Sequence, residues 1–112
     1  MISLDYILEM PALVGVIFII IGIIMLIFPP KKINMLYGYR TNRSMQNQKK
    51  WDFSQKYSAK LLALIGVALT CISTLNIFLN LEEVAEMVVS AILIISSILF
   101  LIVKTENKLK KL

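Results

Sequence analysis

Three long stretches without a charged side chain constrain the fold of this chain more than any other feature. They cover residues 10–30, 61–81 and 87–103. At about 1.5 Å rise per residue, helices of these lengths would reach roughly 31, 31 and 26 Å, against a bilayer hydrocarbon core of about 30 Å. Of all residues, 58% are hydrophobic and 17% are charged, which is not typical of a soluble globule. The sequence predicts an all-α membrane protein with three transmembrane helices.

The charged residues between these stretches predict an orientation. All twelve basic residues lie either between the first and second stretches or after the third; they are Lys31, Lys32, Arg40, Arg43, Lys49, Lys50, Lys56, Lys60, Lys104, Lys108, Lys110 and Lys111. The other two polar segments contain the acidic residues Asp5, Glu9, Glu82, Glu83 and Glu86. Because basic loops stay on the cytoplasmic side, we expect a multi-pass protein with its N-terminus outside and its C-terminus in the cytoplasm.

The whole chain is expected to form a single membrane domain over residues 1–112. Its spans would lie at about residues 10–28, 61–81 and 87–103, with a cytoplasmic loop at residues 29–60. The lysine-rich tail after the third span is expected to fray into solvent.

The cytoplasmic loop is predicted to form an interfacial helix-turn-helix between spans one and two. Pro29 and Pro30 should end the first span, because helix is disfavoured for the residue before a proline. Residues 31–37 have apolar side chains at helical spacing, which predicts a short helix in the membrane interface with Gly38 as its left-handed cap. Ser44 is the expected N-cap of a second helix that continues into span two.

Small residues form stripes on the first two spans. One stripe consists of Gly15 and Gly22, and the other of Ala59, Ala63, Gly66, Thr70 and Ser73. Small residues let membrane helices approach closely, so these stripes favour helix packing, inside the protein or in a homo-oligomer, over a ligand groove.

The residue inventory argues against several function classes. The chain has no histidine and a single cysteine, Cys71, so a metal site or a nucleophile–histidine pair is not expected. Asp52 is the only acid of the cytoplasmic loop, and no catalytic constellation is visible. We therefore predict no enzyme and no cofactor. The net charge of +5 lies next to the membrane, which favours membrane lipids with anionic headgroups over nucleic acid.

The segment from Gly38 to Ser44 is the candidate binding site. Arg40 and Arg43 lie with two hydroxyl side chains just before the predicted helix N-terminus, where free N–H groups favour an anion such as phosphate. The alternative is that both arginines only set topology and bind lipid headgroups without specificity.

A longer motif around this segment resembles the SdpI family of bacterial membrane proteins. It comprises a Pro-Pro exit from a span, Leu36-Tyr37-Gly38-Tyr39-Arg40-Thr41, Arg43-Ser44-Met45 and Trp51. Asn42 departs from the pattern, where proline is expected in many relatives. The founding immunity protein looks like a longer, six-span chain whose C-terminal half is similar to this one. The candidate binding residues are Gly38, Tyr39, Arg40, Thr41, Arg43, Ser44 and Trp51.

The resemblance implies immunity to a secreted antimicrobial peptide or toxin through binding, in a bacterial cell membrane. It also implies an alternative, a membrane scaffold that recruits a cytoplasmic regulator or binds anionic lipid through the loop. A third alternative is an oligomeric transporter or channel. The absence of ionisable residues within the uncharged stretches argues against it, because such residues mark proton and ion paths.

Overall fold

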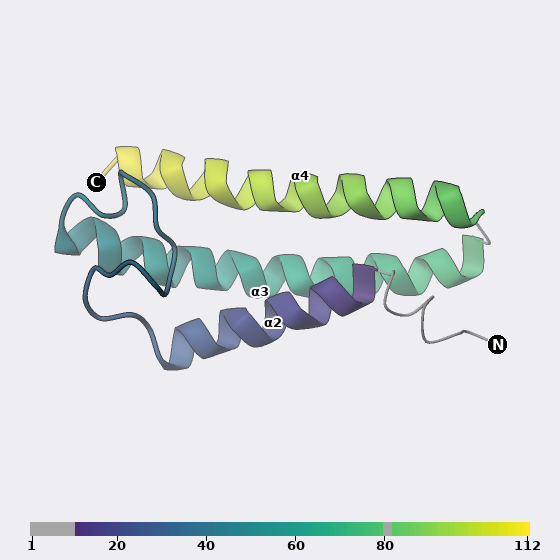
Figure 1. Cartoon of the computed structure of the whole chain (residues 1–112), viewed down its shortest axis with the longest axis horizontal. Helices are drawn as coiled ribbons and strands as arrows, with labels where there is room; N and C mark the ends of the chain where they lie inside the picture. The colour runs from purple at the N-terminus through teal and green to yellow at the C-terminus, as the bar shows by residue number, and fades with distance from the viewer. Residues whose placement is uncertain (1–10, 80–81) are drawn as a thin grey trace.

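A computed structural model describes residues 11–79 and 82–112, and these residues form three helices (Figure 1). The helices are α2 (Pro11–Ile27), α3 (Gln48–Leu79) and α4 (Glu83–Lys110). Helix α3 lies between the other two, and a long loop joins α2 to α3 at the end where α4 finishes (Figure 1). We call residues 28–47 the connecting loop. The predicted all-α fold is confirmed.

Helices α3 and α4 are long and apolar enough to cross a membrane. Helix α2 is apolar but has only 17 residues, or about 25 Å at the usual rise. It ends at Ile27, two residues before Pro29, as the proline pair predicts. Residue 10, where the first span was expected to begin, lies outside the described residues, as do residues 80 and 81 of the connection between α3 and α4.

The small-residue stripes pack α2 directly against α3. A Cβ added to Gly15 would lie 2.7 Å from the carbonyl oxygen of Gly66, and one added to Gly22 would lie 2.9 Å from the backbone nitrogen of Ala63. Backbone therefore meets backbone along this contact, which only glycine allows. The stripes are used within the chain, and this face is not open for self-association.

Helix α3 is continuous from the loop into the bundle, as predicted, but it begins at Gln48 and not after Ser44. Asn47 provides the cap, because its side-chain oxygen accepts a hydrogen bond from the backbone N–H of Lys50 at 2.8 Å. The predicted Ser44 cap is wrong. In the first turns of α3, the rings of Phe53 and Tyr57 stack with their centroids 5.4 Å apart.

The predicted interfacial helix at residues 31–37 is also wrong, because this segment forms bends. The side-chain oxygen of Asn34 accepts hydrogen bonds from the backbone N–H groups of Leu36 and Tyr37, at 2.9 and 2.7 Å. These local bonds offer the backbone an alternative to a helix that would have had fewer than two turns. The predicted helix-turn-helix is therefore a bent loop followed by one helix.

The lysine-rich tail does not fray. Helix α4 continues through Lys110, and its last turns lie beside the connecting loop (Figure 1). Thr105 and Leu109 are fully buried there. The sequence suggested a solvated tail because it is rich in lysine, but the two buried residues are four apart and share one helix face.

Candidate functional site

Trp51 anchors the connecting loop to α3. Its side chain is 0% exposed, and its indole N–H donates a hydrogen bond of 2.7 Å to the carbonyl oxygen of Pro30. Pro30 follows the end of α2 by three residues. Trp51 is therefore an internal contact that fixes where the chain leaves α2.

Gln55 holds the middle of the loop, and the sequence analysis missed it. Its amide oxygen accepts a hydrogen bond from the backbone N–H of Tyr39 at 2.7 Å, and its amide nitrogen donates to the carbonyl of Tyr39 at 2.8 Å. The side chain is buried, so both bonds are protected from water. No local sequence signal identifies such a residue, since a glutamine in an amphipathic helix is ordinarily solvated.

Gly38 has a φ of +109°, so the predicted positive φ is confirmed although the helix it was expected to cap is absent. A Cβ on Gly38 would lie 2.5 Å from the side-chain oxygen of Gln55 and 2.7 Å from Cγ of Pro30. Glycine is therefore required here for two reasons, backbone conformation and space.

Thr41 and Ser44 close a tight turn through reciprocal bonds. The backbone N–H of Thr41 donates to the Ser44 hydroxyl oxygen at 2.8 Å, and the backbone N–H of Ser44 donates to the Thr41 hydroxyl oxygen at 3.1 Å. Ser44 is fully buried. Its hydroxyl is thus committed to the turn, which explains why the helix begins later, with Asn47 as its cap.

Glu106 of α4 clamps the loop from the other side. One of its carboxylate oxygens accepts hydrogen bonds from the hydroxyls of Tyr39 and Thr41, each at 3.2 Å. Burial and then the charge of Glu106 raise the pKa of the Tyr39 phenol far above its usual range, so the phenol keeps its proton and remains a donor. Glu106 is the only acid among the lysines of the tail. This isolated acid was the feature of the sequence that could have indicated a structural role for Glu106.

The two arginines differ from the other predicted site residues. Arg40 is exposed and donates a hydrogen bond from its guanidinium to the carbonyl oxygen of Met35, and Arg43 is partly exposed. The remaining predicted residues take part in the contacts described above, within the loop or, for Trp51, between the loop and α3. The structure thus brings the predicted site residues together, but most of them stabilise the loop, and the arginines lie on its surface. Helix α3 begins at Gln48, so the two arginines do not directly precede its N-terminus in the chain as predicted.

Replacing Gly38 with valine should unfold the loop or displace it from α3, because a β-branched residue is strained at positive φ and its side chain would collide with Gln55. We expect the free energy of unfolding to fall by several kcal/mol, because about 1–3 kcal/mol of backbone strain is added to the cost of the steric overlap. Limited proteolysis of the loop measures the effect. Gln46→Val, at an exposed loop position, is the control, and equal protease resistance of both variants would contradict the assigned role of Gly38.

Comparison with known proteins extends the resemblance beyond the loop. The model of the SdpI/YfhL protein family matches residues 31–104. The uncharacterized protein YfhL of Bacillus subtilis (strain 168) is 38% identical over 99 residues, which cover 86% of this chain and 82% of that protein. The match thus includes most of YfhL and is not limited to one half of a longer chain.

No solved structure matches the chain. The family match includes the whole of α3 and most of α4, the two helices with the length and hydropathy of membrane spans. Together these findings indicate localisation in a membrane. The chain belongs to the SdpI/YfhL protein family.

Proposed function

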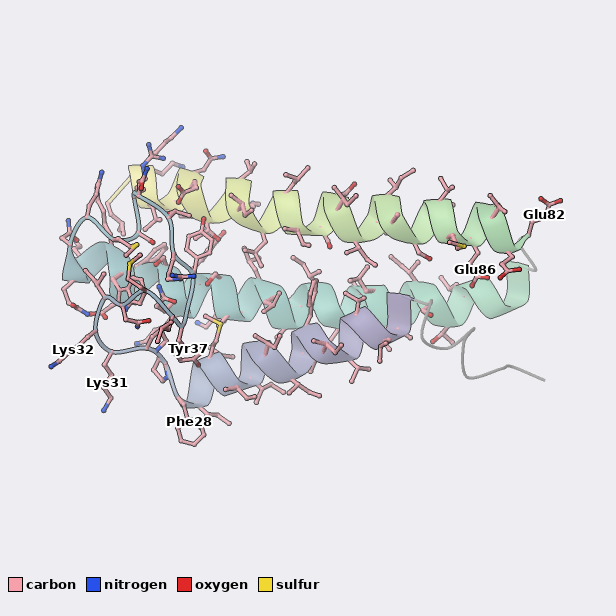
Figure 2. The ribbon with its side chains drawn as sticks, in the orientation of Figure 1. Phe28, Lys31, Lys32, Tyr37, Glu82 and Glu86 are labelled. Atoms are coloured by element: carbon pink, nitrogen blue, oxygen red, sulfur yellow. The ribbon has the colours of Figure 1, made fainter. Side chains whose placement is uncertain are left out.

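We propose that the chain is a three-span protein of the bacterial cell membrane, with its N-terminus outside and the connecting loop and C-terminus in the cytoplasm. The distribution of charge supports this topology. Lys31 and Lys32 lie at one end of the bundle, and Glu82 and Glu86 lie at the other (Figure 2). Helix α2 runs alongside α3 over its length and is apolar, so it would share the bilayer with α3.

The topology is tested with single cysteines in a Cys71→Ser background. A cysteine at Glu83 should react with a membrane-impermeant thiol reagent in intact cells, whereas one at Asn42 should react only after the cells are opened. The physical basis is the retention of basic segments on the cytoplasmic side. Labelling at Asn42 but not at Glu83 in intact cells would invert the orientation.

We further propose that the protein confers immunity to a secreted antimicrobial peptide or toxin by binding, without catalysis. The observation that supports the proposal is that some side chains at the connecting loop are bonded inside the protein while the arginines lie on its surface. The side chains of Tyr39 and Thr41, and of Trp51 in α3, form hydrogen bonds inside the protein. These bonds hold the loop backbone that carries Arg40 and Arg43. A preorganised surface binds with a smaller loss of conformational entropy than a flexible one. Membership of the family supports the functional class.

Arg40→Lys should remove most of the protection against the cognate toxin, because lysine keeps the charge but cannot reproduce the planar, multidentate donor geometry of arginine. The measurement is survival of toxin-treated cells, normalised to the membrane abundance of each variant. Lys108→Gln removes one charge from an exposed position of α4 and should have little effect. If Arg40→Lys protects fully and Lys108→Gln does not, charge number decides and the loop is not a shaped site.

A second candidate function is a scaffold that recruits a cytoplasmic regulator. The observation in its favour is that Met35 and Leu36 are 71% and 94% exposed on the connecting loop, next to the guanidinium of Arg40. Exposed apolar side chains beside an arginine are typical of protein interfaces. Retention of a soluble protein by the wild type, but not by Arg40→Ala or Leu36→Ser, would favour this candidate. Toxin survival without any such partner would favour immunity.

A further inference from the structure

A cleft of about 340 Å³ opens between the exit of α2 and the first turns of α3, next to the candidate site described above, with which it shares Pro30 and Gln55. Its lining residues are Pro29, Pro30, Lys31, Gln48, Asp52, Gln55 and Lys56. Ligand sites commonly measure about 300–1,000 Å³, so the cleft suits a small polar group.

The walls of the cleft are fixed by hydrogen bonds. The amide nitrogen of Gln48 donates to the carbonyl oxygen of Lys31 at 2.6 Å and to the carboxylate of Asp52 at 2.8 Å. The indole N–H of Trp51 donates a hydrogen bond to the carbonyl oxygen of Pro30, which lines the cleft. Both walls are therefore connected to each other and to the buried part of the loop.

The cleft presents charges of both signs. Lys31 and Lys56 are exposed and contribute two ammonium groups, and Asp52 contributes a carboxylate. A carboxylate can accept about four hydrogen bonds, so Asp52 has acceptor capacity beyond its bond with Gln48. The complementary ligand carries an anionic group and, within the same small volume, a cationic group with N–H donors.

The register of the helices places the cleft at the boundary of the apolar surface. Gly22 of α2 packs against Ala59 of α3, and Lys56 lies three residues before Ala59, about 4.5 Å along the helix. The apolar surface that continues from α2 ends at Phe28, which is 70% exposed and lies within about one helical turn of the level of Lys56. Phe28 and Lys31 project from the same side of the molecule (Figure 2). In the proposed topology this is the depth of the cytoplasmic headgroups.

We propose that the cleft binds the headgroup of a phosphatidylethanolamine lipid from the cytoplasmic leaflet. Lys31 and Lys56 bind the phosphate, and Asp52 accepts hydrogen bonds from the ethanolamine ammonium. The acyl chains extend past Phe28 along the apolar surface of α2. The proposal rests on the proposed membrane topology but is independent of toxin immunity.

The acid distinguishes this lipid from the other common headgroups. Phosphatidylcholine carries a quaternary ammonium without N–H donors, so it cannot hydrogen-bond to Asp52. Phosphatidylglycerol could place its phosphate on the same two lysines, but its glycerol carries no cationic group, so the carboxylate of Asp52 would have no ionic partner in the lipid. A generic basic surface would instead prefer the anionic lipid.

The test is native mass spectrometry of the full chain in mild detergent with equimolar dihexanoyl phosphatidylethanolamine, phosphatidylcholine and phosphatidylglycerol. We expect the wild type to retain phosphatidylethanolamine about tenfold over phosphatidylcholine, the effect of one hydrogen bond to a charged group. Asp52→Asn should abolish this preference. Lys56→Gln should weaken retention of phosphatidylethanolamine and of phosphatidylcholine. Lys60→Gln, also exposed on α3 but outside the cleft, is the matched control and should change neither.

Three results would overturn the proposal: equal retention of the two zwitterionic lipids by the wild type, a preference for phosphatidylglycerol, or equal effects of Lys56→Gln and Lys60→Gln. Circular dichroism of each variant checks that the helices are intact, and Lys31→Gln offers a second change to the phosphate partners on the other wall. Cysteine labelling tests the topology separately. Full toxin survival together with absent lipid selection would overturn the lipid site and leave the proposed immunity function in place.

Discussion

Trp51→Ala should be the most destabilising single substitution in this protein, lowering the free energy of unfolding by about 3–5 kcal/mol. The indole is fully buried, so its removal leaves a cavity where the connecting loop meets α3. The carbonyl of Pro30 would also lose its hydrogen bond, which adds the cost of an unsatisfied polar group. Unfolding in a denaturing detergent, followed by circular dichroism, measures the loss.

Trp51→Phe separates the two contributions, because it keeps an aromatic ring but removes the N–H donor. We expect this variant to lose about 1–3 kcal/mol, less than the alanine variant. Phe53→Ala is the control, since Phe53 is only partly buried and stacks on Tyr57. A smaller loss for Trp51→Ala than for Phe53→Ala would show that Trp51 is not the anchor of the loop.

Gly66→Leu should separate α2 from α3. A Cβ at Gly66 would lie 2.5 Å from the carbonyl oxygen of Gly15 and 2.7 Å from the side chain of Ile19. Because a backbone oxygen cannot rotate away, the helices must move apart, at a cost at or above the usual 1–3 kcal/mol for overpacking. The same unfolding measurement applies, with cysteine cross-linking between α2 and α3 as a direct readout of their separation.

Val67→Leu is the matched control for Gly66→Leu, because Val67 is the next residue and is 50% exposed. It should leave both stability and cross-linking unchanged. If Gly66→Leu altered only the oligomeric state and kept the α2–α3 cross-link, the small-residue stripe would serve contacts between copies of the chain instead.

Features with a local cause could be predicted from the sequence. The uncharged stretches predicted the helices, since an apolar run of this length buries its backbone polar groups by forming a helix. Pro29 predicted the end of α2, and Gly38 predicted a positive φ. The effects of Pro29 and Gly38 depend on neighbours within about one helical turn.

The wrong predictions of a helix at residues 31–37 and of a cap at Ser44 share one cause. Polar side chains compete with the helix for hydrogen bonds to backbone groups. Asn34 bonds to the backbone that would have formed the first loop helix, and Ser44 is bound within its turn by Thr41. The sequence shows that such residues can cap a helix or a turn. It does not show which of the two they do.

The candidate site depended on contacts that only the tertiary structure decided. The loop motif was visible in the sequence, but Gln55 bonds to Tyr39 across 16 residues and Glu106 bonds to Tyr39 across 67. No periodicity or cap links positions so far apart, because their proximity follows from how α2, α3 and α4 pack. The sequence by itself determined three apolar helices and a basic loop. Packing decided that this loop is folded against α3 and α4, with Ser44 buried, the hydroxyls of Tyr39 and Thr41 bonded to Glu106 and Arg40 on the surface.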